Sequence, residues 1–202
     1  MKLNFSIVDK AKQAFEMNCM KLLVSAYHIS VREHIYATNW VENDFTFMLD
    51  EYIDNSAQRV EWEYNCNIEH HLHNANSKKT KGYANSADRI DMRMTTFEKG
   101  IEYRFYVEAK RLKENDSKLL KRYIDTGINH YITKKYPHGI LLGYLVKGDV
   151  DATIQKLNNI LQKNNRRNEM LVRMPNSIHN QYFESTHANF GVIKHFVFDY
   201  SK

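Results

Sequence analysis

The sequence predicts one α/β domain in which helices flank a mixed β-sheet. Segments with apolar residues at helical spacing are interleaved with segments that alternate between apolar and polar residues, and this change of period is typical of that fold class. The chain has 202 residues, of which 43% are hydrophobic, enough for one sizeable core. It holds only 2 prolines and 7 glycines, and no linker or repeat divides it. A disordered polyelectrolyte and a Pro-rich or collagen-like protein are therefore excluded.

Four segments have the spacing of amphipathic helices. The first covers residues 9–34, with Asp9 as the predicted N-cap. In the second, 41–53, apolar side chains at i, i+3, i+4 and i+7 mark the face that is buried, namely Phe45, Met48, Leu49 and Tyr52. Two further helices are predicted over 117–135 and 149–163.

The segments between these helices predict strands. Residues 59–68 alternate strictly between polar and apolar side chains, which is typical of a half-buried strand. The polar segment 69–87 is predicted to be a loop or an irregular excursion. The remaining predicted strands are a hairpin over 89–112, a short apolar run at 139–146, and late strands at 170–172 and 191–200.

Charge and cysteine content narrow the functional classes. The formal net charge of +5 and the pI near 9.0 are compatible with a polyanionic partner, although small groups of basic residues equally suit a solvated surface. Cys19 and Cys66 cannot build a disulfide framework and form no C-x-x-C zinc motif. Residues 1–6 lack the apolar run of a signal peptide, and the longest apolar stretch is too short to span a bilayer. We expect a soluble protein of a reducing compartment, the cytoplasm, with no membrane partner.

The hairpin over 89–112 carries the strongest local prediction. Lys99-Gly100 suits a two-residue turn, because glycine tolerates positive φ. If Glu98 lies opposite Ile101, the residue numbers of every opposed pair add up to 199. One face is then almost entirely apolar, which supports this register, with the pairs Ile90–Ala109, Met92–Val107, Met94–Phe105 and Thr96–Tyr103.

On the other face of the hairpin this register places Asp91 opposite Glu108, with Lys110 beside them. Like charges directly opposite each other in a sheet are destabilising, and two close carboxylates resist joint ionisation. A hard cation between them would remove the conflict, and Mg²⁺ suits one or two carboxylates best. The alternative is an exposed sheet face on which Arg89, Arg93 and Lys110 neutralise the two acids.

These residues resemble the motif of a known family. Asp91, followed after sixteen residues by Glu108-Ala109-Lys110, is similar to the bipartite motif of the PD-(D/E)xK nuclease superfamily, which has the restriction-endonuclease-like fold. Glu42-Asn43-Asp44-Phe45-Thr46 resembles the first-helix motif of many such nucleases. Residues 126–144 are similar to the helix and strand after the motif in uncharacterised members from bacterial defence loci. No proline precedes Asp91, so Asp88 remains a competing assignment.

The resemblance implies a single domain over 1–202. Within it, 41–147 would form the αβββαβ core, 1–40 an N-terminal helical extension, and 148–202 a C-terminal helix and strands. The implied activity is Mg²⁺-dependent endonucleolytic hydrolysis of DNA phosphodiester bonds in bacterial defence, with Mn²⁺ able to substitute. Double-strand cutting would suit a homodimer, and small nucleases of this kind are usually restrained by a regulatory or defence-system partner protein.

Roles for individual residues follow from the same resemblance. Asp91 and Glu108, with the Ala109 carbonyl, would hold the metal, and Glu42 would complete its ligand shell. Lys110 would orient the attacking water or stabilise the developing charge. On the next helix, basic and amide side chains would contact the phosphate backbone, namely Lys118, Lys121, Arg122 and Asn129.

Other readings remain open. The same fold can serve as a non-catalytic nucleic-acid-binding or interaction module. Glu42 can be an acid favoured by the helix macrodipole, but it lies three residues before Phe45, which places it on the inward face of its helix. The cluster 69–73, Glu-His-His-Leu-His, is better read as a polar loop than as a zinc site. Ser185-Thr186-His187 has no acid partner at a known offset, which argues against a hydrolase triad, and His187 is left as a residue that approaches the site or a partner.

Overall fold

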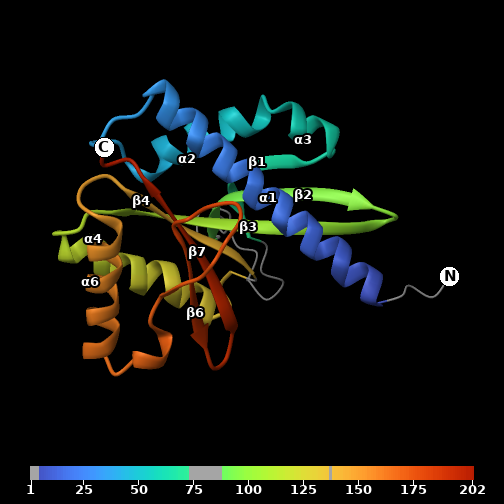
Figure 1. Ribbon diagram of the computed structural model, residues 1–202. Coiled ribbons are helices and arrows are strands. Elements are labelled where there is room, and N and C mark those ends of the chain that lie inside the picture. Colours follow the sequence, from blue (N-terminus) through green and yellow to red (C-terminus); the bar gives the residue numbers. More distant parts are fainter. Residues whose placement is uncertain (1–4, 73–87, 137) are drawn as a thin grey trace, which may run out of the picture.

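The computed structural model describes residues 5–72, 88–136 and 138–202. They form a seven-stranded mixed sheet with the order β1-β2-β3-β4-β7-β6-β5 (Figure 1). β3 runs parallel to β4 and β4 runs parallel to β7, whereas the other neighbours are antiparallel. The strands are β1 (Asn65–His71), β2 (Arg89–Glu98), β3 (Ile101–Leu112), β4 (Gly139–Leu145), β5 (Val172–Arg173), β6 (Tyr182–His187) and β7 (Gly191–Asp199).

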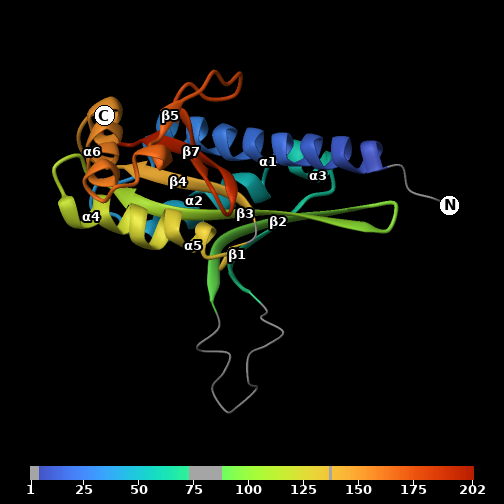
Figure 2. The same ribbon diagram turned by 90° about the horizontal axis from the view of Figure 1, so that it is seen from below.

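Helices cover both faces of the sheet. On one face, α1 (Phe5–Glu33) and α2 (Glu42–Asp54) pack on a cluster that includes Phe105 and Leu142, and the short α3 (Ala57–Glu61) follows α2. The opposite face is covered by the crossover between β3 and β4 and by a later helix. These elements are α4 (Ser117–Arg122), the π-helical η2 (Tyr123–Ile128), α5 (Asn129–Ile132) and α6 (Val150–Lys163). Figure 2 shows α1 on one side of the sheet and α4 and α5 on the other.

The helix termini follow local chemistry. The Val41 backbone N–H donates to Asp44 Oδ2 (2.8 Å), which fixes the start of α2. Asp149 caps α6 by accepting from the Ala152 N–H (2.9 Å). The predicted buried face of α2 is confirmed, since Phe45, Met48 and Leu49 are buried and Tyr52 is half-buried.

The predicted hairpin register is confirmed over the paired positions, which run from Glu98↔Ile101 to Met92↔Val107. Lys99 and Gly100 have φ of +50° and +81°, as a two-residue turn of this kind requires. Beyond Met92 the prediction fails in one respect: Ile90 packs in the cluster under the crossover helices, not with Met92 on the α1 face.

Several predicted boundaries are wrong. The strand predicted from residue 59 begins at Asn65, because Ser56 caps a single helical turn, α3, through the Arg59 N–H (3.4 Å). The predicted N-cap Asp9 lies inside α1, which starts earlier. The start of the predicted loop 69–87 belongs to β1, residues 73–87 lie outside the described residues, and β6 was not predicted.

Close contact between β3 and β4 depends on one glycine. Gly139 has φ of +152°, and a Cβ built there would lie 1.8 Å from the Tyr106 carbonyl oxygen. The backbone of β4 therefore enters the sheet at a position that no side chain can occupy.

Candidate active site

The middle of the sheet places Glu108 and Lys110 under the crossover helices. Both point to that face of β3, and they are only 3% and 5% exposed. The Lys110 ammonium donates to Glu108 Oε1 and to the Ala109 carbonyl (2.8 Å), and it lies 3.8 Å from Glu42 Oε2. A Cβ on Gly127 of η2 would lie 3.5 Å from Lys110 Cγ, so the crossover packs directly on this side chain.

Asp91 reaches the same place from β2. Its Oδ2 accepts the Ala109 backbone N–H at 2.6 Å, just beyond the last paired position of the hairpin. The carboxylate thus takes the place of a backbone acceptor at the point where the two strands stop pairing. The predicted opposition of Asp91 and Glu108 lies beyond the paired positions, so a side-chain contact and not a ladder pair joins the strands there. The charge of Asp91 nevertheless acts on the Glu108 carboxyl.

The Glu108 carboxyl is electrostatically strained. Burial, and then the nearby charge of Asp91, raise the pKa of Glu108 to about 8, although the Lys110 ammonium opposes the shift. The Tyr136 hydroxyl donates to the Arg89 carbonyl (3.2 Å) and also opposes the rise in the pKa of Glu108. By hydrogen-bond geometry, Glu108 Oε2 has no partner among the residues that the structure describes. A buried carboxyl oxygen of this kind, beside a second carboxylate, suits a hard divalent cation, which takes one or two carboxylates as ligands.

Glu42 occupies the first turn of α2 and faces the site. Its Oε1 pairs with Arg122 Nη1 at 2.7 Å, and its side chain is 12% exposed. Burial raises the pKa of Glu42, while Lys110 and Arg122 oppose that shift. Glu42 is therefore the inward-facing acid that the sequence predicts, and two cations contact it.

The carboxylates do not form a complete metal shell by themselves. Within the described part of the chain, no group of three or more His, Cys, Asp or Glu side chains is arranged to hold a metal ion. Asp91 and Glu108 fit a cation that keeps most of its ligands as water or substrate oxygens, as Mg²⁺ does.

The arginines of the alternative prediction face elsewhere. Arg89 lies 3.7 Å from Glu69, and Arg93 donates to Asn67 Oδ1 at 3.4 Å. The competing Asp88 is exposed and pairs with Lys135 at 2.9 Å. Position and burial therefore favour Asp91 over Asp88 as the acid of the site.

The predicted phosphate contacts are spread along the crossover. Lys118 and Lys121 are exposed, and Lys121 lies 3.9 Å from Asp125. Arg122 is directed toward Glu42, and Asn129 is half-buried at the start of α5. The π-helical η2 lies between Arg122 and Asn129, so a regular helical face does not join them.

Sequence reasoning missed a buried hydrogen-bond chain, because its members lie far apart in the sequence. Glu169 supplies the acid partner that Ser185-Thr186-His187 was predicted to lack: its Oε2 lies 2.7 Å from His187 Nδ1. Ser185 Oγ bridges His187 Nε2 (2.7 Å) and His195 Nε2 (2.8 Å), and His195 Nδ1 contacts the Tyr123 hydroxyl (2.9 Å).

These hydrogen-bonded residues include the serine, histidine and acid of a hydrolase triad, but the serine is not accessible to a substrate. Ser185 is 1% exposed and His195 is fully buried, so Ser185 does not face a substrate. Burial lowers the pKa of His195 to about 3 and also lowers that of His187. With both imidazole rings neutral, each hydrogen bond of this series has one donor and one acceptor. The direction of donation runs from Tyr123 through His195, Ser185 and His187 to the acceptor Glu169.

The histidine-rich segment gives no metal site in the described residues. Glu69, His70 and His71 belong to β1, and Glu69 accepts a hydrogen bond from Asn43 Nδ2 (2.8 Å). His73 lies outside the described residues.

Comparisons with known proteins add no assignment. No family model, no curated protein and no solved structure matches the chain. None of the helices in the described ranges combines the length and the apolar character that crossing a bilayer requires. What the chain shows by itself is a mixed α/β domain whose central strands bring two acids and a lysine together.

Proposed function

We propose that this protein is a Mg²⁺-dependent endonuclease that hydrolyses DNA phosphodiester bonds. The observation that carries the proposal is the buried Glu108 carboxyl, whose pKa is raised to about 8 beside Asp91 and whose Oε2 has no hydrogen-bond partner among the described residues. Perturbed carboxyls of this kind gather at functional sites. The arrangement of Asp91, Glu108 and Lys110 resembles the PD-(D/E)xK motif, which supports the proposal.

The order of elements supports a restriction-endonuclease-like core. α2 precedes the antiparallel strands β1, β2 and β3, the helical crossover follows, and β4 returns parallel to β3. This is the helix, three strands, helix, strand order of that fold. Asp91 lies on β2, Glu108 and Lys110 lie on β3, and Glu42 lies on α2, which supports the roles that the resemblance implies for them.

In this proposal the chain's own residues prepare the scissile phosphate for attack. Asp91 and Glu108 would hold Mg²⁺ together with the Ala109 carbonyl, and Glu42 would act through water. When bound, the metal would polarise the phosphate and lower the pKa of a coordinated water. Lys110, held by Glu108 and the Ala109 carbonyl, would donate hydrogen bonds to the attacking water or to the phosphate oxygen that gains charge. Glu108 would lose its proton as the cation binds, because the positive charge of the cation stabilises the carboxylate form that burial disfavours.

Exposed cations next to the site fit the backbone of a nucleic acid. Lys118 and Lys121 lie on α4, and Arg122 ends that helix beside Glu42. Contacts of this kind position a duplex but carry no sequence information. Service in bacterial defence, a homodimer and a restraining partner protein remain expectations from the family resemblance.

Cleavage of supercoiled plasmid tests the proposal. The wild-type protein is expected to nick or linearise plasmid with Mg²⁺ or Mn²⁺ and not with EDTA, and Asp91→Asn and Glu108→Gln are expected to lose at least ~100-fold in rate. Asp88→Asn is the matched control, since Asp88 is exposed and lies three residues away, and it is expected to cut normally. Equal cutting by Asp91→Asn and the wild type would contradict the proposal.

A binding module on the same fold is the second candidate. It is favoured by one observation: the Lys110 ammonium pairs with Glu108 and so neutralises one of the two acids from within the chain. In that case the purified protein would bind DNA in a salt-sensitive manner, as phosphate contacts require, and no metal would produce cleavage.

A further inference from the structure

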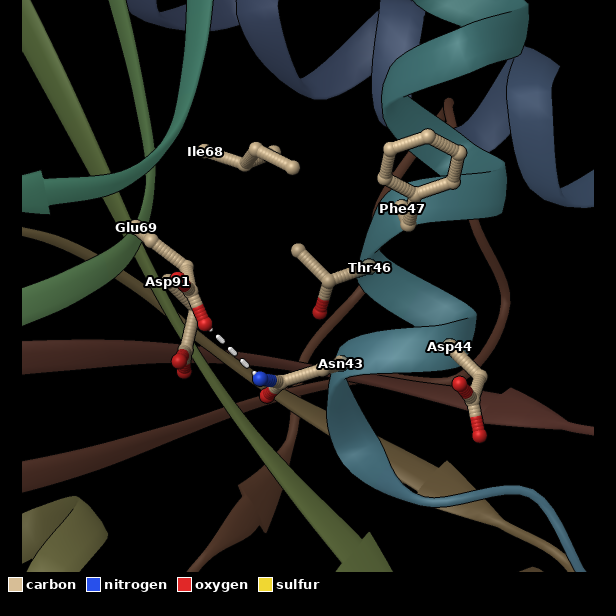
Figure 3. Close-up of a pocket in the computed structure, with 7 residues that line it drawn as sticks. All are labelled: Asn43, Asp44, Thr46, Phe47, Ile68, Glu69 and Asp91. Carbon is tan, nitrogen blue, oxygen red and sulfur yellow. Dashed lines mark hydrogen bonds between the residues drawn. The ribbon is translucent and has the colours of Figure 1, made fainter.

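A pocket opens directly beside Asp91, between α2 and the strands β1 and β2 (Figure 3). Its volume is about 300 Å³, at the small end of ligand sites, and it has room for a single flat ring system. It is lined by Asn43, Asp44, Thr46, Phe47, Ile68, Glu69 and Asp91.

One part of the pocket is apolar. Phe47 is 60% exposed although it is a large aromatic residue, and Ile68 lies across the pocket from it (Figure 3). The Thr46 hydroxyl is engaged with the Glu42 carbonyl and the Tyr144 hydroxyl (3.1 Å each), and Figure 3 shows its methyl group turned toward Ile68. A flat apolar ligand can therefore lie between an aromatic ring and aliphatic groups.

The other part carries hydrogen-bonding groups. Asn43 Nδ2 donates to Glu69 Oε1 (2.8 Å), which holds the two side chains together and leaves the Asn43 amide oxygen as an acceptor. Glu69, Asp44 and Asp91 make the pocket acidic, so it disfavours phosphate and favours a ligand edge with N–H donors. The aromatic face of Phe47 and the acceptors on the opposite side of the pocket together match the flat ring and the N–H edge of a nucleobase.

We infer that this pocket, which shares Asp91 with the candidate active site, binds one unpaired nucleobase of single-stranded DNA, stacked on Phe47. The inference rests on the proposed function, because Asp91 is shared by the pocket and the candidate active site. It names the substrate class: DNA in which a nucleotide next to the cut is unpaired or easily extruded. A fully paired duplex must first unstack that base, so it is a poorer substrate.

Fluorescence tests the pocket without any cleavage. Phe47→Trp is titrated with a single-stranded oligonucleotide in EDTA, and the wild-type signal from Trp40 and Trp62 is subtracted. A base stacked on the new indole quenches its emission, and an abasic oligonucleotide of the same length and charge is expected not to. Phe97→Trp is the matched control, because Phe97 is 67% exposed at the end of the β2–β3 hairpin and does not line the pocket. Equal quenching of the two variants, or by the abasic strand, would overturn the inference.

Cleavage separates this inference from the proposed function. Phe47→Ala is expected to raise KM for single-stranded DNA by about tenfold, whereas Phe47→Tyr keeps a stacking ring and restores KM. If Asp91→Asn abolishes cleavage but Phe47→Ala cuts single-stranded DNA with an unchanged KM, the nuclease stands and the base pocket is wrong. If no variant cuts but Phe47→Trp is quenched only by strands that carry bases, the pocket stands and the nuclease proposal fails.

Discussion

Replacing Glu108 by glutamine is expected to stabilise the protein, although it removes the central acid of the candidate site. The folded chain raises the pKa of Glu108 from 4.5 to about 8, chiefly by burial and then by the charge of Asp91. Between pH 4.5 and about pH 8, Glu108 keeps its proton in the folded state and has lost it in the unfolded state. The contribution of this carboxyl to stability is therefore complete below about pH 4.5 and is lost as the pH rises through about 8. Glutamine resembles the protonated carboxyl at every pH.

The magnitude follows from the two pKa values. One pKa unit is worth about 1.4 kcal/mol. Relative to a side chain that stays neutral, Glu108 therefore lowers the free energy of unfolding by about 3 kcal/mol at pH 7 and by about 1 kcal/mol at pH 5. In a chain of this length, 3 kcal/mol corresponds to a rise of roughly 6–12 °C in Tm.

Urea unfolding of the wild type and of Glu108→Gln, at pH 5 and pH 7, measures the effect. The advantage of the variant is expected to shrink by about 2 kcal/mol from pH 7 to pH 5. Glu98→Gln, an exposed position on the same hairpin, is the matched control and is expected to change little. Mg²⁺ is expected to raise the Tm of the wild type and not that of Glu108→Gln, which gives a readout independent of cleavage.

A result in the opposite direction would refute this reasoning. If Glu108→Gln is less stable than the wild type at pH 7, the ion pair with Lys110 outweighs the desolvation of the carboxyl. If the difference between variant and wild type is the same at pH 5 and pH 7, Glu108 does not titrate in the range that its surroundings require.

Three further predictions concern the fold around the site. Gly139→Ala is expected to lose about 3 kcal/mol or more, because its Cβ would meet the Tyr106 carbonyl oxygen at 1.8 Å; an unchanged urea midpoint would show that β4 can shift. Leu142→Ala, in the centre of the sheet and fully buried, is expected to cost about 2–5 kcal/mol in the same assay, and a loss below 1 kcal/mol would mean that the cavity collapses. His195 has a pKa lowered to about 3 by burial, so the unfolded state takes up a proton first as the pH falls; about 1.5 kcal/mol is expected to be lost between pH 6.5 and pH 5. The last measurement belongs in the Glu108→Gln background, where the opposing slope of Glu108 is absent, and a flat profile there would contradict it.

The sequence predicted the hairpin well because two independent constraints agree there. The Lys99-Gly100 turn and the apolar face of the strands each require the same pairing, and the structure has it from Glu98↔Ile101 to Met92↔Val107. Glu42 was predicted to face inward from its spacing to Phe45, and its side chain is 12% exposed. Alternation alone was a weaker guide. Val60 and Trp62 alternate with polar neighbours and were predicted to lie in a strand, but the backbone there forms one turn of helix that Ser56 caps.

Long-range side-chain partners could not be predicted in the same way. Nothing local in the sequence indicates that Glu169 accepts from His187, or that Arg122 contacts Glu42 from the crossover. Such pairs depend on how the elements pack in three dimensions. The pocket at Phe47 is a similar case, because exposure of an aromatic residue is known only once the neighbouring strand is placed.

The irregular backbone at Glu69 has a consequence for self-association. Among the described residues β1 is an outer strand of the sheet, and such strands offer backbone groups to which another chain can add. Glu69 has φ of +48° in the middle of this strand, with Ile68↔Met92 and His70↔Ile90 paired on either side. A strand that docked along the open edge would lose its regular hydrogen bonds at this residue. The conformation that places the Glu69 side chain beside Asp91 thus also makes β1 a poor template for aggregation.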